Sequence, residues 1–588
     1  MEKPIQSPLG ADNAILASIP ANHETRTLAM SIFFDGTSGD DTLIGTEGDD
    51  AFYGAEGNDT LIGRGGADIY IFEAPTDGHD TIRDTGGIDT MAFHSWIWDI
   101  DLHRNGTSLI IGDNLAPRTV RVENFYGTDG AIEYLETHSG RFNLMTTNTG
   151  GTGNDVLIGS SVDEVFYGGG GTDIIFGAGG DDTLDGGSGK NWIKGGSGDD
   201  TYIHNGFYST LDTISETGSG GSDTLQMTGL LLSGMYFRRS GEHLVIERYD
   251  TSKATRALDA IKQVVIEDQF NIDPHHRIEM LETADGLRWL KTGLTGTATH
   301  DILVGTTQSE TISGGAGNDL YFNAGGKDTL IDQAGNDFYR LALGWGVEVS
   351  IADASGTDSL QIHGDRNEHL EFRRSGTALV IDYSATDAKV ILQDHFGTGT
   401  IETLEIDFFP FRTVTRHSAT YTISAGLQAT DSADIIVGSL ADDEIIGGLG
   451  SDWLVGGGGN DSLYGGSGYD TIVGGAGKDR MTGGAGRDTF DFNDLSDSGT
   501  SGATMDIIYD FYAQSNSWSH DVIDLTDIYW GRLHFIYRDD YPGELGIMRY
   551  DWVDGNTVIG IDMDGDMVDD FNILLVGEIR LSQFDFLL

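Results

Sequence analysis

A period of nine residues is the feature that most constrains this chain. Residues 36–71 divide into four nonapeptides, GTSGDDTLI, GTEGDDAFY, GAEGNDTLI and GRGGADIYI. Gly opens each nonapeptide, the sixth residue is Asp, and the eighth is Leu, Phe or Tyr. Self-similarity at a short fixed period predicts a solenoid in which every repeat adds the same structural unit.

The same frame returns three more times along the chain. Further arrays run over residues 150–203, 296–340 and 429–491, so the four arrays hold 4, 6, 5 and 7 repeats. A solvated Gly/Asp linker has no reason to place an apolar residue two positions after each acidic one. The fixed spacing of acidic and apolar residues therefore predicts folded arrays and excludes a flexible low-complexity chain.

The composition of the repeat points to calcium. A glycine-rich hexapeptide can turn sharply and direct backbone carbonyl oxygens and one carboxylate inward, which is the oxygen ligand set that Ca²⁺ accepts. The last three residues form a short strand, two nonapeptides make one coil, and turns n and n+2 then stack on one edge and share an ion. The predicted Ca²⁺ ligands are the sixth-position aspartates Asp41, Asp50, Asp59, Asp68, Asp155, Asp173, Asp182, Asp200, Asp301, Asp319, Asp328, Asp337, Asp434, Asp443, Asp452, Asp461, Asp470, Asp479 and Asp488.

The overall charge agrees with this interpretation. Asp and Glu total 94 against 34 Lys and Arg, and the formal net charge is −60. Such a chain repels phosphate backbones, so we expect no nucleic-acid partner, and its carboxylates repel one another until divalent cations bind. The chain has no Cys, which leaves only oxygen-rich metal sites. No apolar run approaches the roughly 20 residues of a membrane span.

The arrays resemble those of the RTX (repeats-in-toxin) family, the haemolysin-type calcium-binding repeats. The resemblance implies an all-β fold in which nonapeptide repeats form calcium-bound parallel β-rolls. Some turns depart from the family pattern, because Glu164 and Glu310 lengthen the sixth side chain and Asn191 removes its charge. The opening turns GSSVDE, GTTQSE, TATHD and ATDSAD also lack the internal Gly. We expect these turns to cap the arrays and to bind Ca²⁺ weakly or not at all.

The segments between the arrays are copies of one another. Residues 102–112 (LHRNGTSLIIG), 237–247 (FRRSGEHLVIE) and 372–382 (FRRSGTALVID) match, and two further strand-like runs follow each copy. Alternation of apolar and polar residues around Gly predicts β-hairpins with one buried face. The segments resemble the domain often attached to haemolysin-type repeats.

Two features of these segments leave a glycan or cell-surface partner open. Two copies carry paired arginines: Arg238, Arg239, Arg373 and Arg374. These pairs suit an acidic-sugar site, or they are charges paired with nearby carboxylates. Four tryptophans lie in the same segments: Trp96, Trp98, Trp289 and Trp345. They suit either sugar stacking or core packing.

The C-terminal region resembles the C-terminal domain of serralysin-type secreted metalloproteases over about residues 490–588. The strings DFNDLSDSGT, MDIIYDF, HDVIDLTDI and IDMDGDMVDDFNILLVG carry this resemblance. In that family a type I secretion exporter reads a terminal acidic residue followed by bulky apolar ones, and this chain ends Asp585, Phe586, Leu587, Leu588. The resemblance implies a secreted, extracellular or cell-surface protein. It also explains why residues 1–30 show no signal-peptide pattern.

Motifs for catalysis are missing from the sequence. There is no HExxH zinc motif, no GxSxG nucleophile elbow and no completed phosphate loop. We therefore expect no enzyme but a secreted calcium-binding RTX repeat protein that folds on extracellular Ca²⁺ and has a structural, adhesive or matrix role. The alternative is an accessory or carbohydrate-binding module of a secreted polysaccharide-modifying exoenzyme.

The expected domain order follows from these segments. A leader segment occupies 1–35, and the arrays occupy 36–73, 150–203, 296–340 and 429–491. Three β-modules occupy 74–149, 204–295 and 341–428, and the serralysin-like C-terminal domain with the secretion signal occupies 492–588.

Overall fold

The structure is a computed structural model of the 588-residue chain. It describes residues 32–73, 78–97, 100–113, 116–127, 132–204, 209–216, 221–232, 235–248, 262–271, 277–323, 325–364, 370–384, 386–397, 401–408, 417–424, 429–513, 520–528, 533–536 and 544–588. Most of the predicted leader segment and Trp98 lie outside the described residues. The described chain is built from β-strands, with no α-helix, and this confirms the predicted all-β fold. It divides into two compact units, Met1–Thr292 and Gly293–Leu588.

None of the described residues belongs to a helix long and apolar enough to cross a membrane.

Two parallel sheets form the first roll of unit 1. One sheet contains, in order, β1 (Ile32–Asp35), β3 (Asp50–Tyr53), β5 (Ile69–Phe72) and β7 (Thr90–Phe93). The other contains β2 (Thr42–Ile44), β4 (Thr60–Ile62) and β6 (His79–Arg83). Successive nonapeptides thus enter opposite sheets, and Ala51 pairs with Ile69, 18 residues later. This register confirms that two nonapeptides make one coil.

The eighth-position side chains fill the space between the two sheets. Phe52, Leu61 and Tyr70 are completely buried. The rings of Phe52 and Tyr70 stack at 5.1 Å across neighbouring coils. The core is therefore a one-dimensional column in which each coil adds one apolar layer.

The first linking segment continues the roll and then closes one of its sheets. Its first strands are β6 and β7, which extend both sheets of array 1. A hairpin of β8 (Ile100–Asn105) and β9 (Ser108–Asp113) then pairs antiparallel with β10 (Ala116–Val122), which is parallel to β6. In the other sheet, β11 (Tyr134–Thr137) and β12 (Gly140–Leu144) connect β7 to β13 (Asp155–Ile158), the first strand of array 2.

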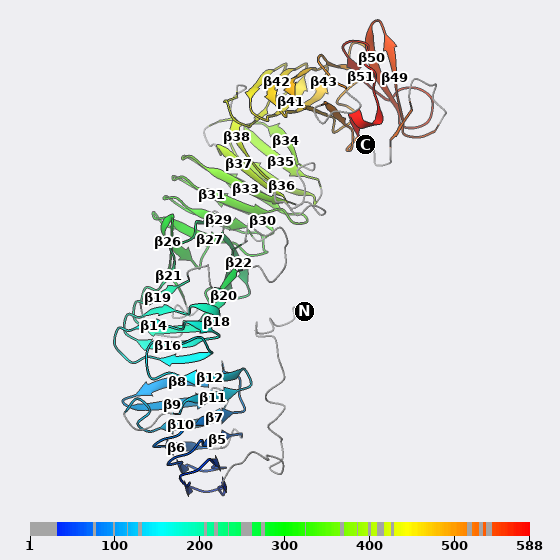
Figure 1. The fold of residues 1–588 in the computed structure, drawn as a ribbon. Helices are drawn as coiled ribbons and strands as arrows, with labels where there is room; N and C mark the ends of the chain where they lie inside the picture. The colour runs from blue at the N-terminus through cyan, green and yellow to red at the C-terminus, as the bar shows by residue number, and fades with distance from the viewer. Residues whose placement is uncertain are drawn as a thin grey trace. The chain divides into compact units, whose positions relative to one another are not determined.

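The second roll of unit 1 repeats this plan. After β13, one sheet contains β16 (Ile174–Gly179), β18 (Ser188–Ser197), β20 (Ser209–Ile214), β24 (Lys262–Ile266), β23 (His243–Arg248) and β22 (Met235–Ser240), with β15 (Gly170–Gly171) beside β18. The facing sheet contains β14 (Val165–Tyr167), β17 (Thr183–Asp185), β19 (Thr201–Ile203), β21 (Thr224–Met227), β25 (Met280–Thr283) and β26 (Gly286–Lys291). The hairpin β22–β23 corresponds to β8–β9, because β23 pairs antiparallel with β24 as β9 does with β10. Figure 1 shows β8, β9 and β10 side by side.

Unit 2 contains one long sheet that faces two shorter ones in turn. The long sheet contains β27 (Asp301–Val304), β29 (Leu320–Asn323), β31 (Phe338–Ala342), β33 (Ser359–Gly364), β37 (Thr403–Phe408), β38 (His417–Ser424), β39 (Asp434–Val437), β41 (Trp453–Gly459), β43 (Thr471–Gly477), β45 (Thr489–Asp491), β47 (Val522–Asp524) and β52 (Phe586–Leu587). The first short sheet contains β28 (Thr311–Ser313), β30 (Lys327–Ile331), β32 (Glu348–Ala352), β36 (Ala388–Leu392), β35 (Ala378–Tyr383) and β34 (Leu370–Ser375). The second contains β40 (Glu444–Leu449), β42 (Ser462–Gly468), β44 (Arg480–Gly486), β46 (Asp506–Ile508), β51 (Phe571–Leu575), β50 (Asn556–Asp562), β49 (Ile547–Val553) and β48 (His534–Phe535).

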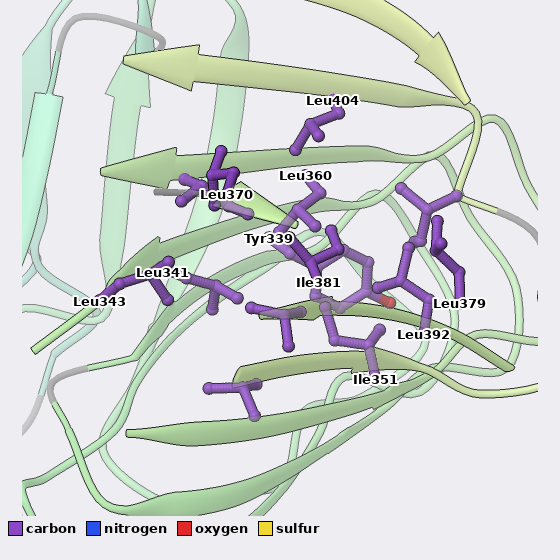
Figure 2. Close-up of a cluster of buried hydrophobic side chains, with 14 of the residues drawn as sticks. Tyr339, Leu341, Leu343, Ile351, Leu360, Leu370, Leu379, Ile381, Leu392 and Leu404 are labelled. Carbon is purple, nitrogen blue, oxygen red and sulfur yellow. The ribbon is translucent and has the colours of Figure 1, made fainter. Parts of the chain in front are cut away.

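The core of array 3 continues into the linking segment that follows it. Leu360 and Leu404 from the long sheet and Ile351 and Ile381 from the short sheet belong to one buried cluster (Figure 2). The linking segment therefore shares its apolar core with the array and does not form a separate one. The same continuity lets acidic residues of the linking segment reach the turns.

The C-terminal tail packs onto the last coil. Strand β52 pairs in parallel with β47. Ser582 caps a short 3₁₀ turn, and its hydroxyl donates to Asp585 Oδ2 at 2.9 Å. Asp585 and Phe586 are buried, whereas Leu587 and Leu588 are partly exposed.

Candidate metal centres

The sixth-position carboxylates form a ladder along one edge of each roll. The backbone N–H of Asp461 donates to Asp479 Oδ1, 18 residues later, at 2.8 Å. The same bond joins all 14 pairs of sixth positions that lie 18 residues apart within the arrays, at 2.7–3.1 Å. One carboxylate oxygen therefore aligns neighbouring coils, and the other is left for a different partner.

That second oxygen is buried and accepts no hydrogen bond from the described residues in most interior turns. It is Oδ2 of Asp68, Asp173, Asp182, Asp200, Asp337, Asp452, Asp461, Asp470, Asp479 and Asp488. A buried carboxylate oxygen without a partner is costly. A bound cation would remove this cost, so these side chains fit a metal ion.

Backbone oxygens converge on the same places. A Cβ added to Gly465 would lie 2.5 Å from Asp470 Oδ2 and 2.5 Å from Gly483 O, the carbonyl oxygen of the stacked turn. Carboxylate and carbonyl oxygens are the ligand type that Ca²⁺ prefers. The sixth-position Asp and the carbonyl oxygens of two stacked turns would hold the ion, which would neutralise the buried charge.

The electrostatics of the metal-free turns agree with this assignment. Burial raises the pKa of Asp452, Asp479 and Asp488 to about 7. Repulsion from the next carboxylate on the ladder adds to this rise, as Asp470 does for Asp452. Protons and divalent cations therefore compete for the same oxygens near neutral pH.

The first two turns of each array differ from the interior turns. In all eight, the carboxylate accepts a hydrogen bond from the N–H of the second residue of its own turn, as Asp41 does from Thr37 at 2.6 Å. The sequence predicts weak binding for the turns that lack internal Gly, and their carboxylates are satisfied within the turn. Asp155 behaves in the same way although its turn, GGTGND, has the full glycine pattern. Position at the start of a stack, and not glycine content alone, sets this geometry.

The predicted ligands thus fall into two groups in the structure. Asp41 and Asp443 are partly exposed, and the other predicted aspartates are buried. Asp328 is an exception among the interior turns, because its Oδ2 accepts a hydrogen bond from Asn323 at 2.7 Å. Which of these turns hold Ca²⁺ stays a prediction.

The ladder also includes acids that the nine-residue frame misses. Asp59 N–H donates to Asp80 Oδ1 and Asp68 N–H to Asp89 Oδ1, 21 residues later in each case. The further ladder acids outside the arrays include Asp223, Asp358, Asp506 and Asp521. Each of these six acids stands two residues before an apolar core residue, as in DTI, DTM, DTL, DSL, DII and DVI. This pattern of an acid two residues before an apolar residue is present even where the nine-residue period is broken.

The paired arginines make contacts within their own linking segments. Arg373 Nε lies 2.7 Å from Asp382 Oδ2, and the guanidinium of Arg374 stacks over the Phe396 ring at 4.3 Å. The copy in unit 1 repeats both contacts with Glu247 and Phe270. Of the two interpretations open from the sequence, pairing with carboxylates describes Arg373 and Arg238, whereas Arg374 and Arg239 lie over aromatic rings.

A separate acidic group, Asp562, Asp564 and Asp566, lies in the turn between β50 and β51. Asp562 accepts hydrogen bonds from the N–H groups of Gly565 and Met567, and Asp566 accepts one from Val568. These carboxylates stabilise the turn itself.

Comparisons with known proteins agree with the sequence and the geometry. The family model for the RTX calcium-binding nonapeptide repeat matches residues 35–70, 149–184, 167–202, 176–210, 295–330, 428–463 and 455–490. The comparison with curated proteins gives no match. Among solved structures, the R3 subunit of a mannuronan C5-epimerase from Azotobacter vinelandii shares 34% identity, over 26% of this chain and 81% of that one, with a TM-score of 0.21.

A second solved structure is the extracellular lipase LipA from Serratia marcescens. It shares 16% identity over 51% of this chain, with a TM-score of 0.17, and this chain spans 42% of the lipase. The repeat matches fall on all four predicted arrays. The chain therefore carries the calcium-binding nonapeptide repeats of the RTX family in all four arrays, and these repeats bind calcium.

Proposed function

We propose that this protein is secreted, folds on extracellular Ca²⁺ and has a structural, adhesive or matrix role. The observation that carries the proposal is the buried carboxylate ladder, in which interior turns hold an oxygen such as Asp461 Oδ2 without a hydrogen-bond donor. Extracellular calcium modules bind with Kd of about 10⁻⁴–10⁻³ M, far above cytosolic free Ca²⁺. The arrays would then stay open inside the cell and fold outside.

The C-terminal tail supports export before folding. Asp585 and Phe586 are buried against the last coil, and β52 is part of the long sheet. A type I exporter that reads these residues must meet them before β52 forms. Calcium-dependent folding would supply that delay, because the last array would remain open until the chain reaches the outside.

A non-catalytic role fits the same residues. The buried titratable groups of the ladder are carboxylates, which suit a hard cation such as Ca²⁺. The sequence also lacks the zinc, nucleophile-elbow and phosphate-loop motifs of the common hydrolases.

One observation favours the alternative of a carbohydrate-binding accessory module. Trp345 is 83% exposed in the turn between β31 and β32. An exposed indole offers a flat apolar face on which a sugar ring can stack. Trp345→Ala should abolish binding to a polysaccharide if this alternative holds, and should change nothing if the role is structural.

Two measurements on the full-length chain test the proposal. In chelator, circular dichroism should show open arrays, and β signal should appear cooperatively near millimolar Ca²⁺. In a host with a type I exporter, the chain should reach the medium. Both chelator and calcium samples are measured at pH 8, where ladder carboxylates such as Asp452 and Asp479 are mostly ionised. Folded arrays in excess chelator at that pH would contradict calcium-gated folding, and retention in the cell would contradict export.

A further inference from the structure

Buried carboxylates gather at places where the arrays run into the linking segments. In unit 1, Asp68, Asp84 and Asp89 each offer an oxygen within 4.8 Å of the other two. In unit 2, Asp337, Asp353 and Asp358 do the same. All six residues are buried. Two further triads have the same makeup: Asp200, Glu216 and Asp223, and Asp319, Asp332 and Asp337.

A change at the first position of the turn creates the triads that contain Asp84 and Asp353. Asp84 precedes Asp89 by five residues, as Gly465 precedes Asp470 in an ordinary turn. Asp353 stands in the same relation to Asp358. The motif is D-x-x-G-x-D in place of G-G-x-G-x-D. Each triad therefore combines two sixth-position carboxylates of stacked coils with a third carboxylate that the ordinary turn does not have.

A buried tyrosine fixes the third carboxylate. Tyr339 Oη donates to Asp353 Oδ2 at 2.6 Å, and Tyr70 Oη donates to Asp84 Oδ2. Both tyrosines occupy the eighth position of the preceding repeat on the same sheet, and Tyr339 packs within the core cluster of Figure 2. The third carboxylate is therefore held in one orientation before any ion arrives.

The triads also contain oxygens that lack donors. Oδ2 of Asp68 and of Asp89 is buried and accepts no hydrogen bond from the described residues, and the same holds for Asp337 and Asp358. Two carboxylates of the first triad face a common point, because a Cβ added to Gly63 would meet Asp68 Oδ2, Asp84 Oδ2 and the Tyr70 hydroxyl together. The charges that act on Asp89 come from Asp68, Asp84 and Glu133, and all of them are acidic.

We propose that the triads are divalent-cation sites with one carboxylate more than the sites shared by ordinary nonapeptide turns, and that they bind Ca²⁺ before those ordinary sites do. Calcium affinity rises with the number of charged ligands and the rigidity of the site. A triad offers three carboxylates, whereas two stacked turns offer two, and a tyrosine fixes the third carboxylate at Asp84 and Asp353. The filled triads at Asp89, Asp223 and Asp358 would join arrays 1, 2 and 3 to the linking segments that follow them. This inference does not depend on secretion.

The first test is a calcium titration of the full-length chain, with bound ions counted by equilibrium dialysis. Wild type should show a tight class of ions with Kd at least about tenfold below that of the remaining sites. The double variant Asp84→Asn, Asp353→Asn keeps the shape and an acceptor for each tyrosine. It should lose two ions from the tight class and keep the weaker class. The matched control Asp461→Asn, in an ordinary interior turn, should lose one weak ion and keep the tight class.

A second variant guards against misfolding. Asp84→Gly with Asp353→Gly restores the ordinary turn sequence and should convert two tight sites into weak ones without loss of β signal. Tb³⁺ provides an independent readout, because an ion bound beside Tyr70 or Tyr339 is excited through the tyrosine ring. Tyrosine-sensitised Tb³⁺ emission at low ion concentration should fall in both double variants and persist in the control. A single class of sites in wild type, or an intact tight class in both variants, would overturn the proposal.

Discussion

Replacing Gly465 by Ala tests the geometry of the interior turn directly. The added Cβ would lie 2.5 Å from both Asp470 Oδ2 and Gly483 O, closer than the 3.0 Å below which real Cβ contacts essentially never occur. The methyl group would occupy the place where a carboxylate and a carbonyl oxygen converge. It should therefore disturb the packing of the turn and displace the ion at the same time.

The expected loss has two parts. Forcing a methyl group into a packed turn costs about 1–3 kcal/mol, with or without calcium. An ion present at about 100 times its Kd contributes about 2.7 kcal/mol, and this part is lost only in calcium. A total of about 4–6 kcal/mol corresponds to a fall of about 10³- to 10⁴-fold in the local folding equilibrium.

Hydrogen exchange of the full-length chain at millimolar Ca²⁺ measures this loss locally. Amides of β42 and β44 should lose protection in Gly465→Ala. Gly39→Ala is the matched control, because Gly39 lies in an opening turn and an added Cβ has no atom within 4 Å. The control should keep wild-type protection throughout array 1. Wild-type protection of β42 and β44 in Gly465→Ala would refute the convergence of oxygens on an ion at this turn.

The remaining predictions concern occupancy, protons and export. Asp443→Asn, in an opening turn, should leave the number of dialysed Ca²⁺ ions unchanged, whereas Asp461→Asn should reduce it by one; equal losses would contradict the division of turns. Burial raises the pKa of Asp479 to about 7, whereas the pKa of an Asp in the unfolded chain is about 4. Protonation of Asp479 therefore stabilises the metal-free roll fully below about pH 4, and this stabilisation is lost as the pH rises through about 7. Circular dichroism in chelator should therefore show β signal gained on acidification from pH 8 to 5, and the midpoint of the calcium titration at pH 6 should lie above that at pH 8. Removal of residues 586–588 should abolish secretion in a host with a type I exporter; undiminished secretion would require another route.

The period predicts the arrays and their core because both depend on local spacing. Gly at the first position lets two turns approach, Asp at the sixth bonds the next coil, and the eighth residue reaches the core. Phe52 and Leu61 are completely buried for this reason. The pairing of turns 18 residues apart follows from the same spacing. No contact outside the repeat is needed to deduce it.

The junction acids could not be predicted in the same way. Asp84 stands where the repeat pattern has Gly, and Asp89 follows Asp68 by 21 residues, so a search in a nine-residue frame passes over both. Their meeting depends on β7 pairing with β5 after an intervening coil. The hydrogen bond of the Tyr70 hydroxyl to Asp84 could not be predicted either, because the eighth position accepts any large apolar residue. Only the pairing of the strands brings these three side chains together.

The ladder explains how the linking segments keep the rolls in register although they break the period. Successive ladder acids lie 18 residues apart within the arrays, but 21 apart from Asp68 to Asp89, 27 from Asp479 to Asp506 and 33 from Asp488 to Asp521. Lengthening a loop costs little entropy, because the cost grows only with the logarithm of its length. The ladder acid must keep its hydrogen bond to the preceding coil, because this bond fixes the edge of the roll. The apolar residue two positions later must also be kept, because its side chain fills the core. A coil can therefore gain residues between these points without interrupting the row of carboxylates, and nine residues per repeat is one of several spacings that satisfy both contacts.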